Sequence, residues 1–315
     1  MPRIFVAARD GLHTFDERGQ EGVTQHAGTP VTAIVRDGPH LWAIVDRTEV
    51  WYAPEDEWHH VATLENAEAT CIAMTDAIHV GSSGARLFRL NGGSLEPVAG
   101  FDAVEGRDGW YTPWGGPPDT RSISEWGQDV YVNVHVGGIP HTSDQGRTWN
   151  PTIDVDEDVH QVATAEGVVL AAGARGLSVS SDRGATWTLR TDGLEAHYCR
   201  AVVVCGQSVL VSASNGPRGG RAAVYRASLE SGPFQRCREG LPDWFHDNID
   251  TYCLDALNDG SYAAFGTADG RVYTSGDGGV TWEAVATGLS PVQHLLIVPD
   301  WARTDPTAGY QPATS

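Results

Sequence analysis

The sequence contains no lysine. All 21 basic residues are arginines, set against 41 aspartates and glutamates, and the formal net charge is −20. Without lysine, Schiff-base catalysis and lysine general bases are excluded. The acidic balance also argues against nucleic-acid partners, which need a basic footprint. A lysine-free acidic surface resembles the proteins of salt-loving archaea, and a high-GC genome that favours arginine codons would give the same bias.

Long apolar runs and cysteine pairs are also missing. No stretch approaches eighteen uninterrupted apolar residues, so we expect no membrane span. The N-terminal residues MPRIFVAARDG do not have the charged and apolar regions of a signal peptide. The five cysteines form no CxxC pair, which favours small buried thiols: Cys71, Cys199, Cys205, Cys237 and Cys253. We therefore predict a cytoplasmic protein.

An eight-residue pattern occurs three times. TSDQGRTW (142–149), SSDRGATW (180–187) and SGDGGVTW (275–282) share Ser/Thr-x-Asp-x-Gly-x-Thr-Trp. Their aspartates are 38 and 95 residues apart, which corresponds to one repeat and then two. A repeat of about 40–50 residues is typical of propeller blades with four strands each.

Weaker copies complete the repeat. Four other segments keep a strand, a turn and a second strand, at 11–23, 49–58, 85–98 and 223–236. Seven inner strands are predicted to begin at Val31, Thr70, Thr120, His160, Cys199, Thr251 and Val292. We predict an all-β, seven-bladed propeller over residues 1–300, with a C-terminal tail at 301–315. Pairing of VQHLLIV (292–298) with RIFVAARDG (3–11) would close the ring with both chain ends.

The pattern resembles the Asp-box, or bacterial neuraminidase repeat, family of β-propellers. The resemblance implies a hairpin turn between the third and fourth strands of a blade. In such a turn, Asp144, Asp182 and Asp277 accept hydrogen bonds from backbone N–H groups. The glycine of each copy permits a positive φ, and the tryptophan buries its ring beside the turn. We therefore expect a structural role for the repeat itself.

The resemblance extends to sialidases only in part. Sialidases carry an Arg-Ile-Pro segment, an arginine triad and a Tyr–Glu nucleophile pair. This chain has Phe5 after Arg3-Ile4, and Arg121 and Arg200 are the only candidates for the triad. No Tyr–Glu pair is identifiable. The repeat also occurs in assembly factors, other sugar-cleaving enzymes and sorting receptors. The repeat alone therefore does not indicate which of these functions the chain has.

Candidate site residues come from the loops that frame one face of the channel. The catalytic candidates are His160, Asp250, Arg121 and Arg200. The ligand-binding candidates are Trp114, His135, His197, Tyr198, Asn248, Tyr252 and His294. Arginine forks bind carboxylate or sulfate, aromatic rings stack on sugars, and a His–Asp pair supplies general acid and base. Aligned by the turns that follow them, His160 and His294 fall one position before Arg121 and Arg200, so convergence of both pairs is left open.

The longest loop, 101–119, contains three large aromatic residues. We predict an ordered flap with Trp114 over the channel mouth near Arg121 and His160. The alternative is that Trp110 and Trp114 fill a gap between the third and fourth blades.

No local spacing specifies a metal site, and none is assigned. The cofactor is unknown, although imidazoles from separate loops (His135, His160, His197, His294) offer a transition-metal set. The acidic run DVDED (154–158) lacks the glycine and glutamate spacing of a calcium loop, and a solvated loop is expected.

Two functions of different classes remain. The first is an enzyme acting on a small polar or anionic molecule, such as a glycoside, by hydrolysis or elimination. The second is a non-catalytic binding or assembly scaffold. A deep concavity with converging titratable groups favours the first, and a flat or plugged channel favours the second.

Overall fold

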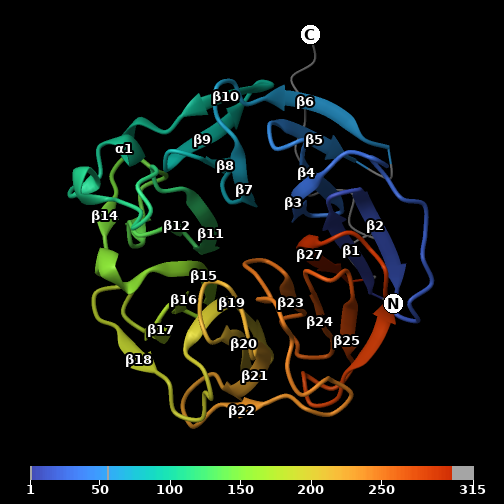
Figure 1. Cartoon of the computed structure of the whole chain (residues 1–315). Coiled ribbons are helices and arrows are strands. Elements are labelled where there is room, and N and C mark those ends of the chain that lie inside the picture. The colour runs from blue at the N-terminus through green and yellow to red at the C-terminus, as the bar shows by residue number, and fades with distance from the viewer. Residues whose placement is uncertain (1, 55–56, 300–315) are drawn as a thin grey trace.

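Seven β-sheets surround a central channel (Figure 1). This computed structural model describes residues 2–54 and 57–299. The predicted all-β, seven-bladed propeller is confirmed. The short helices are α1 (Ala99–Asp102) and the 3₁₀ turns at Arg107–Gly109 and Val155–Glu157. Within the described ranges, no helix has the length and apolar character needed to cross a membrane.

Blades 2–4 each contain four antiparallel strands, which follow one another from the channel outward. Blade 2 is β3 (Val31–Asp37), β4 (His40–Val45), β5 (Glu49–Ala53) and β6 (His59–Thr63). Blade 3 is β7 (Ala69–Met74), β8 (Ile78–Ser82), β9 (Arg86–Asn91) and β10 (Ser94–Pro97). Blade 4 is β11 (Thr120–Trp126), β12 (Asp129–Val134), β13 (Pro140–Thr142) and β14 (Asn150–Pro151).

Blades 5–7 follow the same order. Blade 5 is β15 (Val159–Ala165), β16 (Val168–Gly173), β17 (Gly176–Ser180) and β18 (Thr188–Arg190). Blade 6 is β19 (Tyr198–Cys205), β20 (Ser208–Ser214), β21 (Ala223–Ser228) and β22 (Gln235–Arg236). Blade 7 is β23 (Leu254–Ala256), β24 (Ala263–Gly266), β25 (Val272–Ser275) and β26 (Glu283–Ala286).

Blade 1 is built from both ends of the chain. Its inner strand β27 (Val292–Val298) pairs antiparallel with β1 (Arg3–Ala8), from Arg3↔Val298 to Ala8↔Val292. The next strand is β2 (Gly11–Asp16), and isolated bridges at Glu21 and Gln25 extend the sheet outward. The predicted closure by both termini is therefore present. The predicted tail at 301–315 lies outside the described residues.

The three repeated motifs form the turns between third and fourth strands. Asp182 accepts hydrogen bonds from the backbone N–H of Thr186 at 2.8 Å and from the Thr186 hydroxyl at 2.6 Å. Asp144 and Asp277 make the same pair of contacts with the threonines four residues later. These bonds lower the pKa of the Asp144 and Asp182 carboxyls to about 2, and each motif glycine has a positive φ. The repeat is a turn-stabilising element, as expected.

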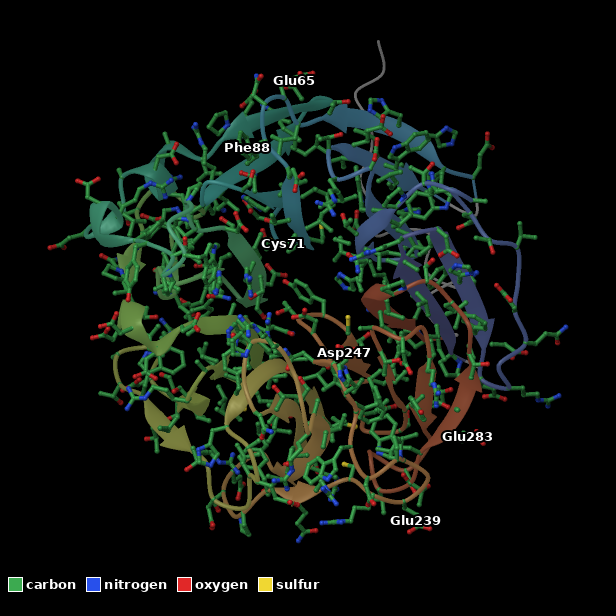
Figure 2. The ribbon with its side chains drawn as sticks, in the orientation of Figure 1. Glu65, Cys71, Phe88, Glu239, Asp247 and Glu283 are labelled. Atoms are coloured by element: carbon green, nitrogen blue, oxygen red, sulfur yellow. The ribbon has the colours of Figure 1, made fainter. Side chains whose placement is uncertain are left out.

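The hydrophobic core is a ring of clusters between neighbouring blades. One cluster joins blades 2 and 3, another blades 3 and 4, and so on around the molecule. Figure 2 shows Cys71, buried on inner strand β7, toward the channel, while Glu65 and Glu239 lie on the outer edge. Because every blade packs against two others, removing one blade exposes apolar surface on both neighbours.

Candidate functional site

Most inner strands carry one extra residue near their start. The pairing of each inner strand with its neighbour shifts register there, which marks a β-bulge in six blades. The bulges lie at Thr32, Thr70, Arg121, His160, Arg200 and Gln293. A bulge redirects a side chain away from the ordinary alternation of a strand. His160 and Arg121 therefore occupy equivalent positions in their inner strands. Alignment by the turns that follow these strands had placed His160 one position before Arg121, and the bulges correct this offset.

Five of these bulges, all except the one at His160, line a cavity at the channel mouth. The cavity has a volume of about 310 Å³ and is open on one side. Its lining side chains are almost all polar: Thr32, Arg47, Glu68, Thr70, Asp119, Arg121, Arg200, Asp250, Thr251, Tyr252 and Gln293. Four predicted site residues therefore meet at this cavity, namely Arg121, Arg200, Asp250 and Tyr252. His160 is not among the lining residues, so it does not share this cavity with Asp250 as predicted.

The cavity lining carries three arginines and three carboxylates, but only two of the arginines are in ion pairs within the described chain. Arg200 Nη1 lies 3.0 Å from Asp250 Oδ1, and Arg47 Nη1 lies 3.1 Å from Glu68 Oε2. Arg121 has no ion pair with any residue in 2–54 or 57–299. Burial lowers the pKa of Arg121, and the nearby charge of Arg200 lowers it further. The cavity thus contains one arginine whose charge has no direct counter-ion in the described chain.

Tyr252 forms the floor of the cavity and closes the channel. Its hydroxyl accepts a hydrogen bond from Ile123 N at 2.9 Å and donates one to Ile123 O at 3.3 Å. Its ring also lines a second cavity of about 330 Å³, formed by the later parts of the inner strands. His294 stacks on the Tyr252 ring at 4.6 Å, and burial lowers the pKa of His294 to about 3. His294 is therefore a neutral packing partner beneath the cavity.

Two other predicted ligand-binding residues lie elsewhere. Asn248 Nδ2 donates to the carbonyls of Gly216 and Pro217, and its Oδ1 accepts from Ser214, so it fastens a loop. His197 is exposed and lines a separate surface depression of about 330 Å³. Both residues were chosen as candidates because they lie near the start of an inner strand in the sequence. Residues at such positions need not point toward the channel.

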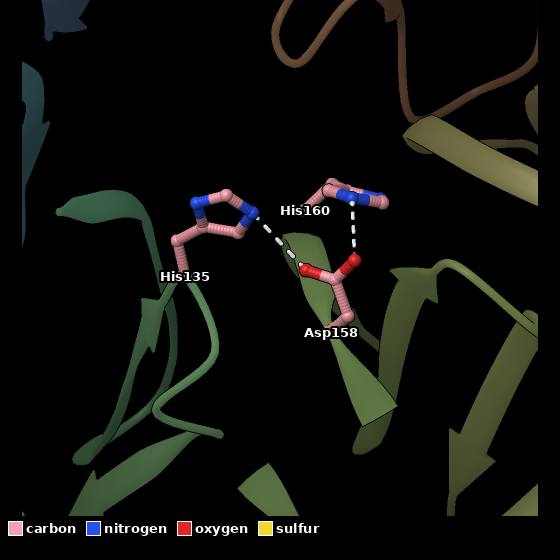
Figure 3. A group of neighbouring side chains, drawn as sticks. All are labelled: His135, Asp158 and His160. Carbon is pink, nitrogen blue, oxygen red and sulfur yellow. Dashed lines mark ion pairs between the residues drawn. The ribbon is translucent and has the colours of Figure 1, made fainter. Parts of the chain in front are cut away.

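A second group of side chains lies between blades 4 and 5 (Figure 3). His135, directly after β12, approaches Asp158 with Nε2 3.1 Å from Oδ1, and His160 Nε2 lies 3.6 Å from Asp158 Oδ2. His135 and His160 are buried, with side chains 5% and 0% exposed. Burial opposes ionisation of Asp158, but the two imidazoles outweigh it and hold the pKa of that carboxyl below its ordinary value.

Asp158 is the site residue that the sequence did not identify. It ends the acidic run 154–158, for which a solvated loop is the expectation, yet its side chain is only 27% exposed. Its backbone has a φ of 46°, which turns the chain sharply at the entry to β15. The alternation of a strand does not identify it from the sequence, because the turn at Asp158 and the bulge at His160 both interrupt that alternation.

Aromatic rings surround this second group. Tyr198 packs on His160 at 4.6 Å and also lies under the Arg200 guanidinium at 5.3 Å, so it contacts both an arginine of the channel cavity and one of the histidines. Trp114 packs on His135 at 5.0 Å, and it lies beside the histidines rather than over the channel cavity. Trp110 instead contacts Phe101 and Arg107 in the packing between blades 3 and 4. Trp110 thus has the packing role given as the alternative, whereas Trp114 does not occupy the predicted place over the channel mouth.

Replacement of Trp114 by alanine is expected to leave the melting temperature almost unchanged, because this ring is 68% exposed. Trp110→Ala is the matched comparison and should lower the melting temperature by several degrees, since it removes a ring packed at the blade interface. Differential scanning calorimetry of both variants checks this. Equal destabilisation would show that Trp114 is a core residue.

Comparison with known proteins supports the fold of this chain but does not identify a function. No family model and no curated sequence matches the chain. Among solved structures, an ancestral GH74 enzyme matches with a TM-score of 0.63 at 15% identity, covering 91% of this chain and 40% of that one. YCF48 from Cyanidioschyzon merolae matches with a TM-score of 0.58 at 14% identity, covering 82% and 87%. The computationally designed Ika8 protein gives 0.59 at 14%, covering 92% and 86%. The chain is thus similar to β-propellers and spans less than half of the GH74 enzyme.

Proposed function

We propose that this protein binds a small anionic molecule in the channel-mouth cavity, with Arg121 and Arg200 as the contacting residues. The observation that carries the proposal is the Arg121 guanidinium, which forms no ion pair within the described chain and lies beside Arg200 in a polar, open cavity. Two neighbouring guanidiniums repel each other, and an anion between them removes that repulsion while accepting bidentate hydrogen bonds. Carboxylate, sulfate and phosphate groups all have this chemistry.

The enzyme form of this proposal assigns acid–base chemistry to Asp250. Its carboxylate is 54% exposed and accepts hydrogen bonds from Arg200 and from the backbone N–H of Thr251. It therefore borders the proposed anion and is open to solvent. Hydrolysis or elimination on an acidic glycoside would use this carboxylate as the proton acceptor. The GH74 neighbour is similar in fold only, and it adds a candidate substrate class without locating a site.

A non-catalytic binding or assembly scaffold is the alternative. The observation that favours it is Tyr252, which plugs the channel and limits the depth of the cavity. We further propose that the chain belongs with the Asp-box propellers, on the strength of its three repeated turns. Residence in the cytoplasm is proposed as well, and it is supported by five unpaired, buried cysteines.

The test of anion binding is the shift in melting temperature with sodium sulfate, compared with sodium chloride at equal ionic strength. We expect sulfate to stabilise the protein and Arg121→Gln to abolish that difference, because the ligand binds only the folded state. The matched control is Arg47→Gln, since Arg47 lines the same cavity but is already paired with Glu68. Sulfate stabilisation that survives in Arg121→Gln, or that is absent in the parent protein, would refute the proposal.

Catalysis is tested separately with 4-nitrophenyl glucuronide, whose sugar carries a carboxylate. The enzyme form predicts release of nitrophenol by the parent protein, with loss of turnover and retention of sulfate binding in Asp250→Asn. Sulfate binding without turnover of this acidic glycoside would favour the scaffold alternative.

A further inference from the structure

The contacts of His160 fix which of its ring nitrogens carries a proton. Nδ1 lies 2.6 Å from the carbonyl oxygen of Cys199, which only accepts hydrogen bonds, so Nδ1 carries the proton. In the neutral ring, Nε2 then presents a lone pair. That lone pair is buried and has no hydrogen-bond partner within residues 2–54 and 57–299. Second-shell carbonyls hold metal-binding imidazoles in this same way.

The lone pair of His160 faces a carboxylate rather than a donor. Asp158 Oδ2 is 3.6 Å from His160 Nε2, beyond hydrogen-bond distance, while Asp158 Oδ1 lies 3.1 Å from His135 Nε2. Buried polar atoms are almost always satisfied, so the unpaired His160 Nε2 beside a carboxylate oxygen is unusual. A cation between them satisfies both atoms at once.

The third side chain completes a metal-binding set. One ligand atom each from His135, Asp158 and His160 lies within 4.8 Å of the others. His135 Nε2 is 3.1 Å from one Asp158 carboxylate oxygen, and His160 Nε2 is 3.6 Å from the other. Metal–ligand bonds of about 2.0–2.2 Å place neighbouring ligand atoms roughly 3–3.5 Å apart. The side chains thus need to move little to surround an ion. In Figure 3 both imidazoles converge on the Asp158 carboxylate.

We propose that His135, Asp158 and His160 bind a divalent transition-metal ion of the zinc class. Two imidazoles and one carboxylate are nitrogen and oxygen ligands that suit Zn²⁺, and three protein ligands leave a coordination position open. Trp114 packs on His135 and Tyr198 packs on His160, so an aromatic ring flanks each of the two imidazoles. The ligands come from two blades, so the ion also joins blade 4 to blade 5.

The site is separate from the proposed anion cavity, which shares none of these three residues. Arg121→Gln should therefore bind zinc like the parent protein. Failure of the metal proposal would leave the anion proposal intact, and the reverse also holds.

The experiment is titration of chelator-stripped protein with Zn²⁺ by isothermal calorimetry, repeated with Co²⁺ to record the d–d absorption of the ligand set. We expect one equivalent of metal to bind and to raise the melting temperature. Asp158→Asn, which keeps the volume of the side chain, and His135→Gln should each weaken binding by at least about 100-fold, since even outer-shell changes cost roughly 10–100-fold.

His141→Gln is the matched control. His141 lies in β13 of the same blade as His135, and its Nε2 is 2.8 Å from Asp129 Oδ1, but this His–Asp pair is not part of a three-residue set among the described residues. It should bind zinc like the parent protein. Loss of binding in His141→Gln together with retention in Asp158→Asn would overturn the proposal, as would absence of stoichiometric binding to the parent. Circular dichroism of each metal-free variant separates lost ligands from lost folding, and Asp158→Asn decides the matter if His135→Gln does not fold.

Discussion

Deletion of residues 290–315 is expected to abolish cooperative unfolding, because it removes β27, the inner strand of blade 1. Val292, Leu295, Ile297 and Val298 on this strand are each no more than 5% exposed. At about 2 kcal/mol for each buried side chain, their burial contributes roughly 8 kcal/mol. Total stabilities of native proteins are about 5–15 kcal/mol, so the loss is comparable to the whole.

The hydrogen bonds lost with β27 add to this effect. Without it, β1 becomes an exposed inner edge with six residues that have lost their pairing partners. Thermal and urea unfolding, followed by circular dichroism and tryptophan fluorescence, measure the result. The matched comparison is a chain that lacks only residues 301–315, so that the difference between the two truncations reports on β27. A 290–315 deletion that melts like this shorter truncation would show that closure by β27 is dispensable.

The propeller was predictable because its determinants are local. The Asp and Thr of each repeat are hydrogen-bonded to each other four residues apart, so this spacing survives in the sequence. Predicted inner strands at Val31, Thr120 and Val292 begin where the structure has them. The prediction at Thr251 is three residues early because Tyr252 has a φ of 61° and lies in a turn before β23 begins at Leu254.

The site was less predictable because it depends on bulges and on contacts between blades. A bulge changes the direction of a side chain without changing the letters around it, so Arg121 and His160 looked offset although they are equivalent. Asp158 meets His135 only when blades 4 and 5 pack together, and no spacing within either blade encodes this contact. His294 is a residue type that often binds ligands, which is why it was a candidate. Its ring instead stacks on Tyr252 beneath the cavity, because the packing of the two buried rings fixes its position.

Tyr252 connects the entry of blade 7 to blade 4 on the other side of the channel. Its replacement is expected to be the most destabilising single substitution in the channel. Its side chain reaches from the entry of blade 7 to the inner edge of blade 4, where β11 has no neighbouring strand on its channel side. The hydroxyl supplies both a donor and an acceptor to the Ile123 backbone, and the Tyr252 N–H donates to Gln161 Oε1 at 3.0 Å. One residue therefore links three blades through their inner strands.

Tyr252→Ala should lower the free energy of unfolding by about 3–5 kcal/mol, as for other large aromatic residues truncated in cores. Tyr252→Phe keeps the ring and its stack on His294 but leaves the Ile123 backbone groups unpaired, which costs about 1–3 kcal/mol. Tyr198→Phe is the control, because the Tyr198 hydroxyl makes no hydrogen bond to any residue that the structure describes. Equilibrium unfolding in guanidinium chloride gives the three values. If Tyr252→Phe and Tyr198→Phe are equally stable, the hydroxyl link across the channel contributes nothing, and the channel is closed by packing of the ring alone.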